Sequence, residues 1–161
     1  VHPLPIIAAL NGLAHGAGAL IAVACDFRIA CQHSEFRVTA INYGSANATW
    51  SLPRLVGAAR AKDIIMTGRC VGPEEGMEIR LYDRLCEASA IVDEAIAMAE
   101  HIATKPRDAI IAAKRLVDQS SATKLTEAWE AEHQHVLEML DAHHSSGGEI
   151  FANFLHERSQ R

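Results

Sequence analysis

The sequence predicts an α/β fold whose first half contains short strands and whose second half is helical. Two patterns carry this prediction. Residues 5–10 form a short apolar run that ends at the turn signal Asn11-Gly12, and small residues then lead into an apolar segment. In the second half, apolar side chains recur at helical spacing. We therefore predict a strand-containing core over residues 1–86 and a helical region over residues 87–161.

The composition is typical of a globular chain. Its 161 residues, 49% of them hydrophobic, suffice to bury one core. The formal net charge of -5 argues against nucleic acid as a partner, and the first apolar run is too short to span a membrane. The four cysteines include no C-x-x-C pair, which favours reduced thiols. We expect a cytoplasmic protein.

Small residues follow the first predicted strand, with glycines at positions 16 and 18. Small side chains let a ligand approach the backbone closely. A helix that follows, expected over residues 20–25, leaves its first N–H groups without acceptors at the positive end of its dipole. Such N–H groups can form an oxyanion hole. A tight turn in a buried strand–helix unit gives the same pattern, so both interpretations stay open.

Two further strands and a loop come next. Apolar residues alternate over 26–31 and again over 35–39, with a polar turn between these segments. The loop over residues 44–50 contains polar side chains before a helix. We expect Ser45 or Asn47 to cap that helix, and Trp50, at the end of the loop, to join the core.

The remaining pattern is mostly helical. Gly68 is a natural stop after one helix, and Gly72-Pro73 suits the start of the next. A short strand is expected at 81–86. The spacing of apolar residues predicts that helices begin near residues 58, 73, 91, 106, 125 and 149.

Four histidines in the helical region raise the question of a metal site. His133 and His135 lie on different faces of a predicted helix, and His143 and His144 fall in a predicted loop. No third ligand stands at the spacing that a zinc site on a helix requires. We therefore expect no metal at these histidines.

The stretch over residues 5–26 resembles the enoyl-CoA hydratase/isomerase (crotonase) family, in which an apolar strand, Asn-Gly, small residues, three glycines, a helix and Cys-Asp follow one another. The resemblance covers nearly the whole chain, through Phe36 and the segments 26–30, 52–57, 66–69 and 149–155. It implies a crotonase-like ββα spiral, then helices that cover the active site and build a homo-trimer or hexamer.

The resemblance also concerns the start of the chain. In the family, further strands and helices precede the strand at 5–10, and they supply the second N–H of the oxyanion hole. We expect this chain to be the C-terminal portion of a longer protein, because so hydrophobic a sheet edge would aggregate if left bare. A half-domain completed by a partner is the alternative.

The resemblance implies an acyl-CoA thioester as ligand, with coenzyme A entering as part of the substrate and no other cofactor. The backbone N–H of Ala17, between Gly16 and Gly18, matches one half of the family's oxyanion hole. The two glutamates of the hydratases fall on Leu20 and Ala40, which cannot transfer protons. Two-glutamate hydration is therefore not expected.

The loop over residues 44–50 departs from the family as well. Some isomerase-like members carry an acidic residue there, and this chain carries none. Asn47 remains as a side chain that can hydrogen-bond a thioester or a water. Two functions stay open: an enzyme that stabilises a thioester enolate for isomerisation, decarboxylation or hydrolysis, and a non-catalytic pseudoenzyme or structural subunit that binds acyl-CoA.

Overall fold

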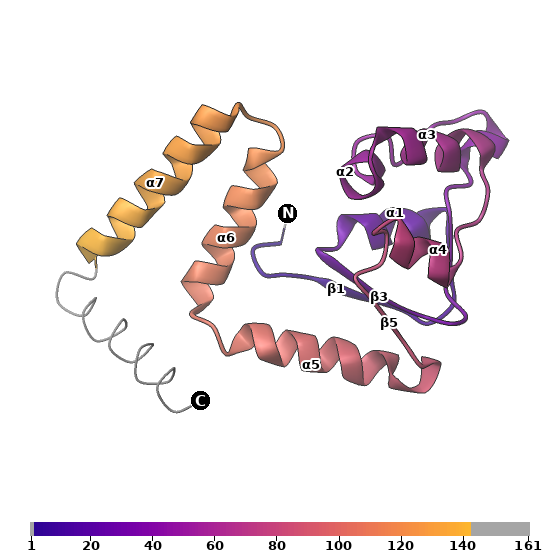
Figure 1. Cartoon of the computed structure of the whole chain (residues 1–161), viewed down its shortest axis with the longest axis horizontal. Helices are drawn as coiled ribbons and strands as arrows, with labels where there is room; N and C mark the ends of the chain where they lie inside the picture. The colour runs from indigo at the N-terminus through magenta and orange to yellow at the C-terminus, as the bar shows by residue number, and fades with distance from the viewer. Residues whose placement is uncertain (1, 143–161) are drawn as a thin grey trace. The chain divides into compact units, whose positions relative to one another are not determined.

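A computed structural model describes residues 2–142 (Figure 1). The predicted helix at 149–158, together with His143 and His144, lies outside these residues. Within them the elements are β1 (Ile7–Leu10), β2 (Leu13–His15), α1 (Ala17–Ala24), β3 (Phe27–Cys31), β4 (Glu35–Arg37), the 3-10 helix η1 (Ala40–Tyr43), α2 (Leu52–Val56), α3 (Ala58–Thr67), α4 (Pro73–Glu78), β5 (Arg84–Cys86), the 3-10 helix η2 (Ala88–Ala90), α5 (Ile91–Ala103), α6 (Arg107–Ser120) and α7 (Leu125–Ala142).

The chain divides between Ile110 and Ile111 into two compact units. The first contains all the strands and helices α1 to α5, and the second contains α7 and most of α6. Helix α5 packs against β1 and β3. The first helix of the predicted helical region thus belongs to the unit that holds the strands.

Two small parallel sheets organise the first unit. One has the strand order β1-β3-β5, in which Ile7 pairs with Phe27 and Ile29 pairs with Arg84. The other pairs β2 with β4. Figure 1 shows β1, β3 and β5 side by side, with α1 and α4 above them and α5 below in this view.

Strand β3 is central and is buried on both faces. Ala30 packs in a cluster with Ala19 and Val23 of α1, whereas Ile29 and Cys31 pack in a second cluster with α5. Burial on both faces is typical of the inner strand of a parallel sheet. The apolar alternation in the sequence therefore predicts this strand, but it does not predict that β3 pairs with both β1 and β5.

The second sheet has one buried face. Ala14 of β2 and Phe36 of β4 are 5% and 0% exposed. Phe36 forms an antiparallel bridge with Val71, through hydrogen bonds of 3.0 and 2.9 Å between their backbone atoms. Burial of a side chain the size of Phe36 stabilises the fold by about 1.5–3 kcal/mol. Because successive side chains of a strand point to opposite faces, the neighbouring residues His15 and Glu35 face away from this buried side.

The turn after β1 differs from the prediction. Leu13–His15 forms a strand, β2, that we did not expect, and α1 begins at Ala17 rather than at residue 20. Gly16 makes this possible, because its φ of 53° and ψ of -116° are accessible mainly to glycine. The chain therefore turns from strand to helix within one residue.

Two predictions for the loop over residues 44–50 are wrong. Neither Ser45 nor Asn47 caps a helix, because the residue before α2 is Ser51, which makes no capping hydrogen bond with its side chain. Trp50 is 66% exposed instead of buried, and its ring lies 5.9 Å from the guanidinium carbon of Arg54. A cation over an aromatic face stabilises an exposed ring.

No helix in the described part of the chain is both long enough and apolar enough to cross a membrane.

Candidate functional site

A cavity of about 340 Å³ lies beside the N-terminus of α1. Its lining comes from the start of α1, the end of β4 with η1, and the following loop: Gly16, Ala17, Leu20, Val38, Thr39, Ala40, Tyr43, Ser45 and Asn47. Five of the six residues predicted from the sequence therefore line one cavity, and Gly18 is the exception. Two segments that are separate in the sequence, residues 16–20 and residues 38–47, meet here.

Gly16 sets the distance between the two walls of the cavity. Its N–H donates to the carbonyl oxygen of Arg37 at 3.1 Å, which joins the start of α1 to the end of β4. A Cβ at this position would lie 3.1 Å from Oγ1 of Thr39. A larger residue would be strained both by the positive φ and by this contact.

Ala17 is the first residue of α1, so its N–H has no acceptor within the helix. The first turn of the helix closes when the N–H of Leu20 donates to the carbonyl oxygen of Gly16 at 3.1 Å. No acidic residue in this turn neutralises the positive end of the helix dipole. A carbonyl oxygen or an oxyanion in the cavity would be stabilised at this end.

The opposite wall is built by η1 and the loop after it. The N–H of Ser45 donates to the carbonyl oxygen of Ala40 at 3.1 Å, and Gly44 adopts a left-handed conformation with a φ of 74°. This tight turn brings Ser45 and Asn47 to the cavity. Tyr43, 83% exposed, is a further residue of the lining.

The described lining of this cavity contains polar groups but no acidic, imidazole or thiol side chain. It offers hydroxyls, one amide and a helix N-terminus, but none of its nine described lining residues is an Asp, Glu, His or Cys. Leu20 and Ala40, the two positions where the resemblance predicts that a hydratase would carry glutamates, are both part of the lining. The site can bind and polarise a carbonyl group, but its side chains include no carboxylate or imidazole to move a proton.

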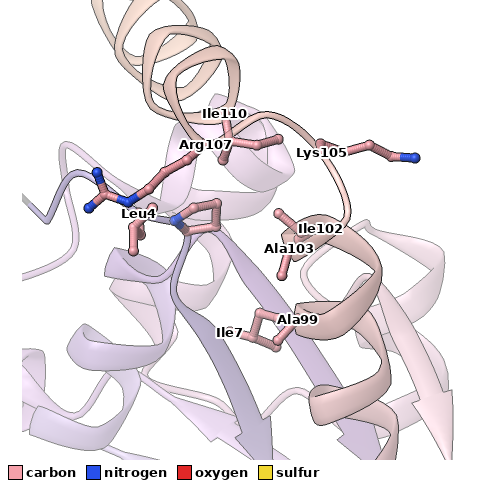
Figure 2. Close-up of a pocket in the computed structure, with 9 residues that line it drawn as sticks. Leu4, Ile7, Ala99, Ile102, Ala103, Lys105, Arg107 and Ile110 are labelled. Carbon is pink, nitrogen blue, oxygen red and sulfur yellow. The ribbon is translucent and has the colours of Figure 1, made fainter. Parts of the chain in front are cut away.

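A second cavity, of about 320 Å³, lies between the start of β1 and the end of α5 (Figure 2). It is lined mainly by apolar side chains, including Leu4, Ile7 and Ile102. The charged groups of Lys105 and Arg107 extend to opposite sides of it in the view of Figure 2. No residue predicted to belong to the functional site lines this cavity.

His133 of α7 takes part in an aromatic contact within its own helix. The ring of His133 stacks on that of Trp129, with centroids 5.1 Å apart. The stacking accounts for the position of His133 without a metal ion.

Comparison with known proteins places these observations in a family. The sequence profile of the enoyl-CoA hydratase/isomerase family matches residues 1–160. The probable enoyl-CoA hydratase echA17 of Mycolicibacterium paratuberculosis is 33% identical over 154 residues, which are 94% of this chain and 59% of that protein.

Solved structures give the same result. An enoyl-CoA hydratase from Bacillus anthracis superposes with a TM-score of 0.88 at 30% identity, over 97% of this chain and 60% of that one. A protein from Thermobifida fusca, solved in complex with CoA, superposes with a TM-score of 0.80 at 27% identity, over 84% and 54%.

This chain thus spans less than two thirds of the length of each of these relatives. The family match nonetheless covers residues 1–160, and the similar structures share the fold. The chain belongs to the enoyl-CoA hydratase/isomerase family.

Proposed function

We propose that the cavity at the start of α1 binds an acyl-CoA thioester and that the N–H of Ala17 donates to its carbonyl oxygen. The observation that carries this proposal is the convergence of five predicted residues on one cavity at a helix N-terminus. The similarity to a structure solved with CoA supports a ligand of this class.

The proposed chemistry is stabilisation of an enolate. Loss of a proton from the α-carbon moves negative charge onto the thioester oxygen, where the N–H of Ala17 and the dipole of α1 oppose it. One donor of an oxyanion hole typically contributes a factor of about 10²–10³ to the rate. Hydration by two carboxylates is not part of the proposal, because Leu20 and Ala40 line the cavity instead.

A second candidate function is binding without chemistry. The absence of Asp, Glu and His from the nine lining residues favours it, since an enolate forms only when a base removes the proton. In this case the chain is a pseudoenzyme or a structural subunit that holds acyl-CoA. The two candidates differ in whether the α-proton of bound acyl-CoA is exchanged.

Exchange of the α-protons of butyryl-CoA in heavy water, followed by mass spectrometry, tests the proposal. Ala17→Pro removes the N–H, and proline is well tolerated at the first position of a helix. We expect Ala17→Pro to slow exchange by about 10²–10³-fold while CoA still binds. Ala17→Gly keeps the N–H and should exchange at the rate of the unmodified protein.

Each other outcome is informative. If the unmodified protein binds butyryl-CoA and exchanges nothing, the pseudoenzyme is the correct function. Equal exchange rates in Ala17→Pro and Ala17→Gly would contradict the role of the Ala17 N–H. Absence of CoA binding by the unmodified protein would contradict both candidates.

The remaining parts of the proposal concern assembly and location. We include a homo-trimer or hexamer, supported by the exposed apolar side chains of Leu125, Trp129 and Val136 along α7. We also include a cytoplasmic location, supported by four cysteines that form no disulfide. No cofactor is required besides the coenzyme A of the substrate.

A further inference from the structure

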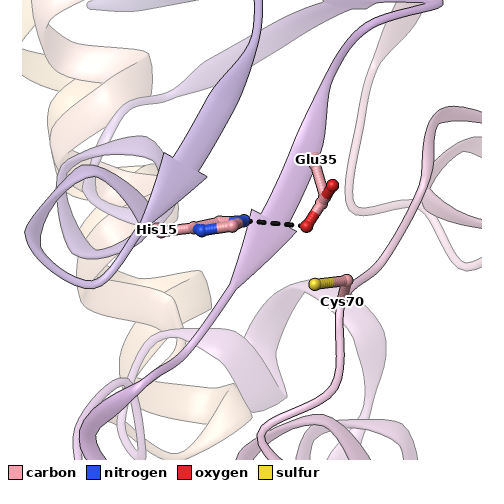
Figure 3. A group of neighbouring side chains, drawn as sticks. All are labelled: His15, Glu35 and Cys70. Atoms are coloured by element: carbon pink, nitrogen blue, oxygen red, sulfur yellow. Dashed lines mark hydrogen bonds and ion pairs between the residues drawn. The ribbon is translucent and has the colours of Figure 1, made fainter.

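Three side chains with metal-binding atoms meet on the second sheet, and none of the three is among the residues that line the proposed active site (Figure 3). His15 comes from β2, Glu35 from β4, and Cys70 from the connector between α3 and α4. Nε2 of His15 lies 3.0 Å from Oε1 of Glu35, and one ligand atom of each residue lies within 4.8 Å of the others. We refer to these three residues as the His–Glu–Cys cluster.

The pairing of the backbone explains why the cluster forms. In the parallel pair of β2 and β4, Ala14 lies beside Phe36, and the antiparallel bridge places Val71 on the other side of Phe36. All three of these side chains are buried. Because neighbouring residues of a strand point to opposite faces, the adjacent residues His15, Glu35 and Cys70 share the outer face.

We propose that the His–Glu–Cys cluster binds a divalent cation of the Zn²⁺ type. An imidazole nitrogen, a carboxylate oxygen and a thiolate sulfur are the three kinds of ligand that Zn²⁺ takes in proteins. The carboxylate and the thiolate together balance the charge of the ion. Three protein ligands leave a fourth position for water or another ligand. A thiolate and an imidazole disfavour Mg²⁺ and Ca²⁺, which select oxygen ligands.

The geometry needs only a small adjustment. In a tetrahedral zinc site with ordinary bond lengths, ligand atoms are about 3.4–3.6 Å apart. The ligand atoms of the cluster lie within 4.8 Å of one another, so none must approach another by more than about 1.4 Å. Nε2 of His15 and Oε1 of Glu35, at 3.0 Å, must instead separate by about 0.5 Å. Rotation of the side chains provides this, while the paired backbones of β2, β4 and Val71 stay in place.

A positive side chain on the same face opposes a cation, so the carboxylate and the thiolate must outweigh it. Arg37, paired with His15 in the strand register, is the positive group of the same face. Its Nε donates to the carbonyl oxygen of Gly68 at 2.6 Å. Because the thiolate and not the thiol is the metal ligand, binding of a cation releases the proton of Cys70 to the solvent.

Titration of the purified protein with Co²⁺ tests the proposal, because Co²⁺ occupies zinc sites and a cobalt–thiolate bond gives a charge-transfer absorption. We expect this absorption to saturate at one Co²⁺ per chain, to disappear when Zn²⁺ is added and to be unaffected by Mg²⁺. Cys70→Ser should abolish the absorption and weaken Zn²⁺ binding by about 100-fold or more, because second-shell changes alone cost about 10–100-fold.

Cys25→Ser is the matched control. Sγ of Cys25 donates to the carbonyl oxygen of Ile21 at 3.3 Å, a hydrogen bond that serine can keep. This variant should bind Co²⁺ like the unmodified protein. Glu35→Gln should weaken binding without changing the far-ultraviolet circular dichroism. No charge-transfer absorption in the unmodified protein, or an absorption that survives Cys70→Ser, would show that the cluster is only a hydrogen-bonded group.

Discussion

Gly76 of α4 occupies a position where no side chain fits. A Cβ placed there would overlap Cδ2 and Cε2 of the Tyr82 ring. The carbonyl oxygen of Gly76 also accepts hydrogen bonds from the N–H groups of Leu81 and Tyr82, at 2.8 and 3.1 Å. Tyr82 itself is 3% exposed, and its burial raises the pKa of the phenol. The chain therefore folds back onto α4 so closely that the ring takes the place of a side chain.

We predict that Gly76→Ala lowers the free energy of unfolding by about 1–3 kcal/mol, because the methyl group overpacks the site. Urea denaturation measures this change. Gly18→Ala in α1 is the control, since a Cβ there meets nothing within 4 Å, and alanine should stabilise that helix by up to about 1 kcal/mol. Equal stability of the two variants would contradict the close contact with Tyr82.

At the scale of elements, the side chain of Arg28 in β3 joins three segments. It is 3% exposed. Its Nε donates to the carbonyl oxygen of Leu81 at 2.7 Å, and Nη1 donates to that of Cys25, also at 2.7 Å. Nη2 lies 3.2 Å from the carboxylate of Asp83. One planar guanidinium thus links the end of α1, the central strand and the segment before β5.

We predict that Arg28→Lys destabilises the protein by about 2–3 kcal/mol. A lysine ammonium lacks the fixed fork of arginine and cannot reach both buried carbonyl oxygens at once. Each buried group left without a partner costs about 1–3 kcal/mol. Arg54→Lys on the exposed side of α2 should change stability by less than about 0.5 kcal/mol. Urea denaturation of the Arg28→Lys and Arg54→Lys variants measures the two changes in stability. Similar denaturation midpoints would contradict the proposed role of Arg28 in linking the three segments.

The elements differ in how far the sequence could predict them. The end of α3 and the start of α4 were predicted correctly, because Gly68 and Gly72-Pro73 act on the adjacent backbone. Strand β2 was missed because it has only three residues and is a strand through its pairing with β4. Trp50 was misplaced because a large aromatic residue indicates burial only on average.

At the scale of the whole molecule, the proposed active site and the His–Glu–Cys cluster also differ in how far the sequence could predict them. The lining of the cavity could be predicted, because family motifs mark both of its walls. The His–Glu–Cys cluster could not. Alternation along β2 and β4 puts His15 and Glu35 on outer faces, but Cys70 joins them only through the single bridge between Phe36 and Val71. Nothing in the sequence indicates that long-range pairing.

The proposed active site has an oxyanion donor but no side-chain carboxylate to act as a base, and this leads to a prediction about the whole protein. Leu20→Glu introduces a carboxylate into the lining. If the cavity holds a thioester with its carbonyl at Ala17, this base should speed α-proton exchange by about 10²–10⁴-fold. Ile21→Glu is the control, because Ile21 is 67% exposed on the same helix and does not line the cavity.

Exchange of butyryl-CoA protons in heavy water, measured for both variants, decides the question. Faster exchange in Leu20→Glu alone would mean that the cavity positions the substrate for enolate formation whether or not the unmodified protein catalyses it. If Leu20→Glu binds CoA but exchanges no faster than Ile21→Glu, the α-carbon does not lie near α1. The cavity would then bind the CoA portion of the ligand, and the proposed role of Ala17 would be wrong.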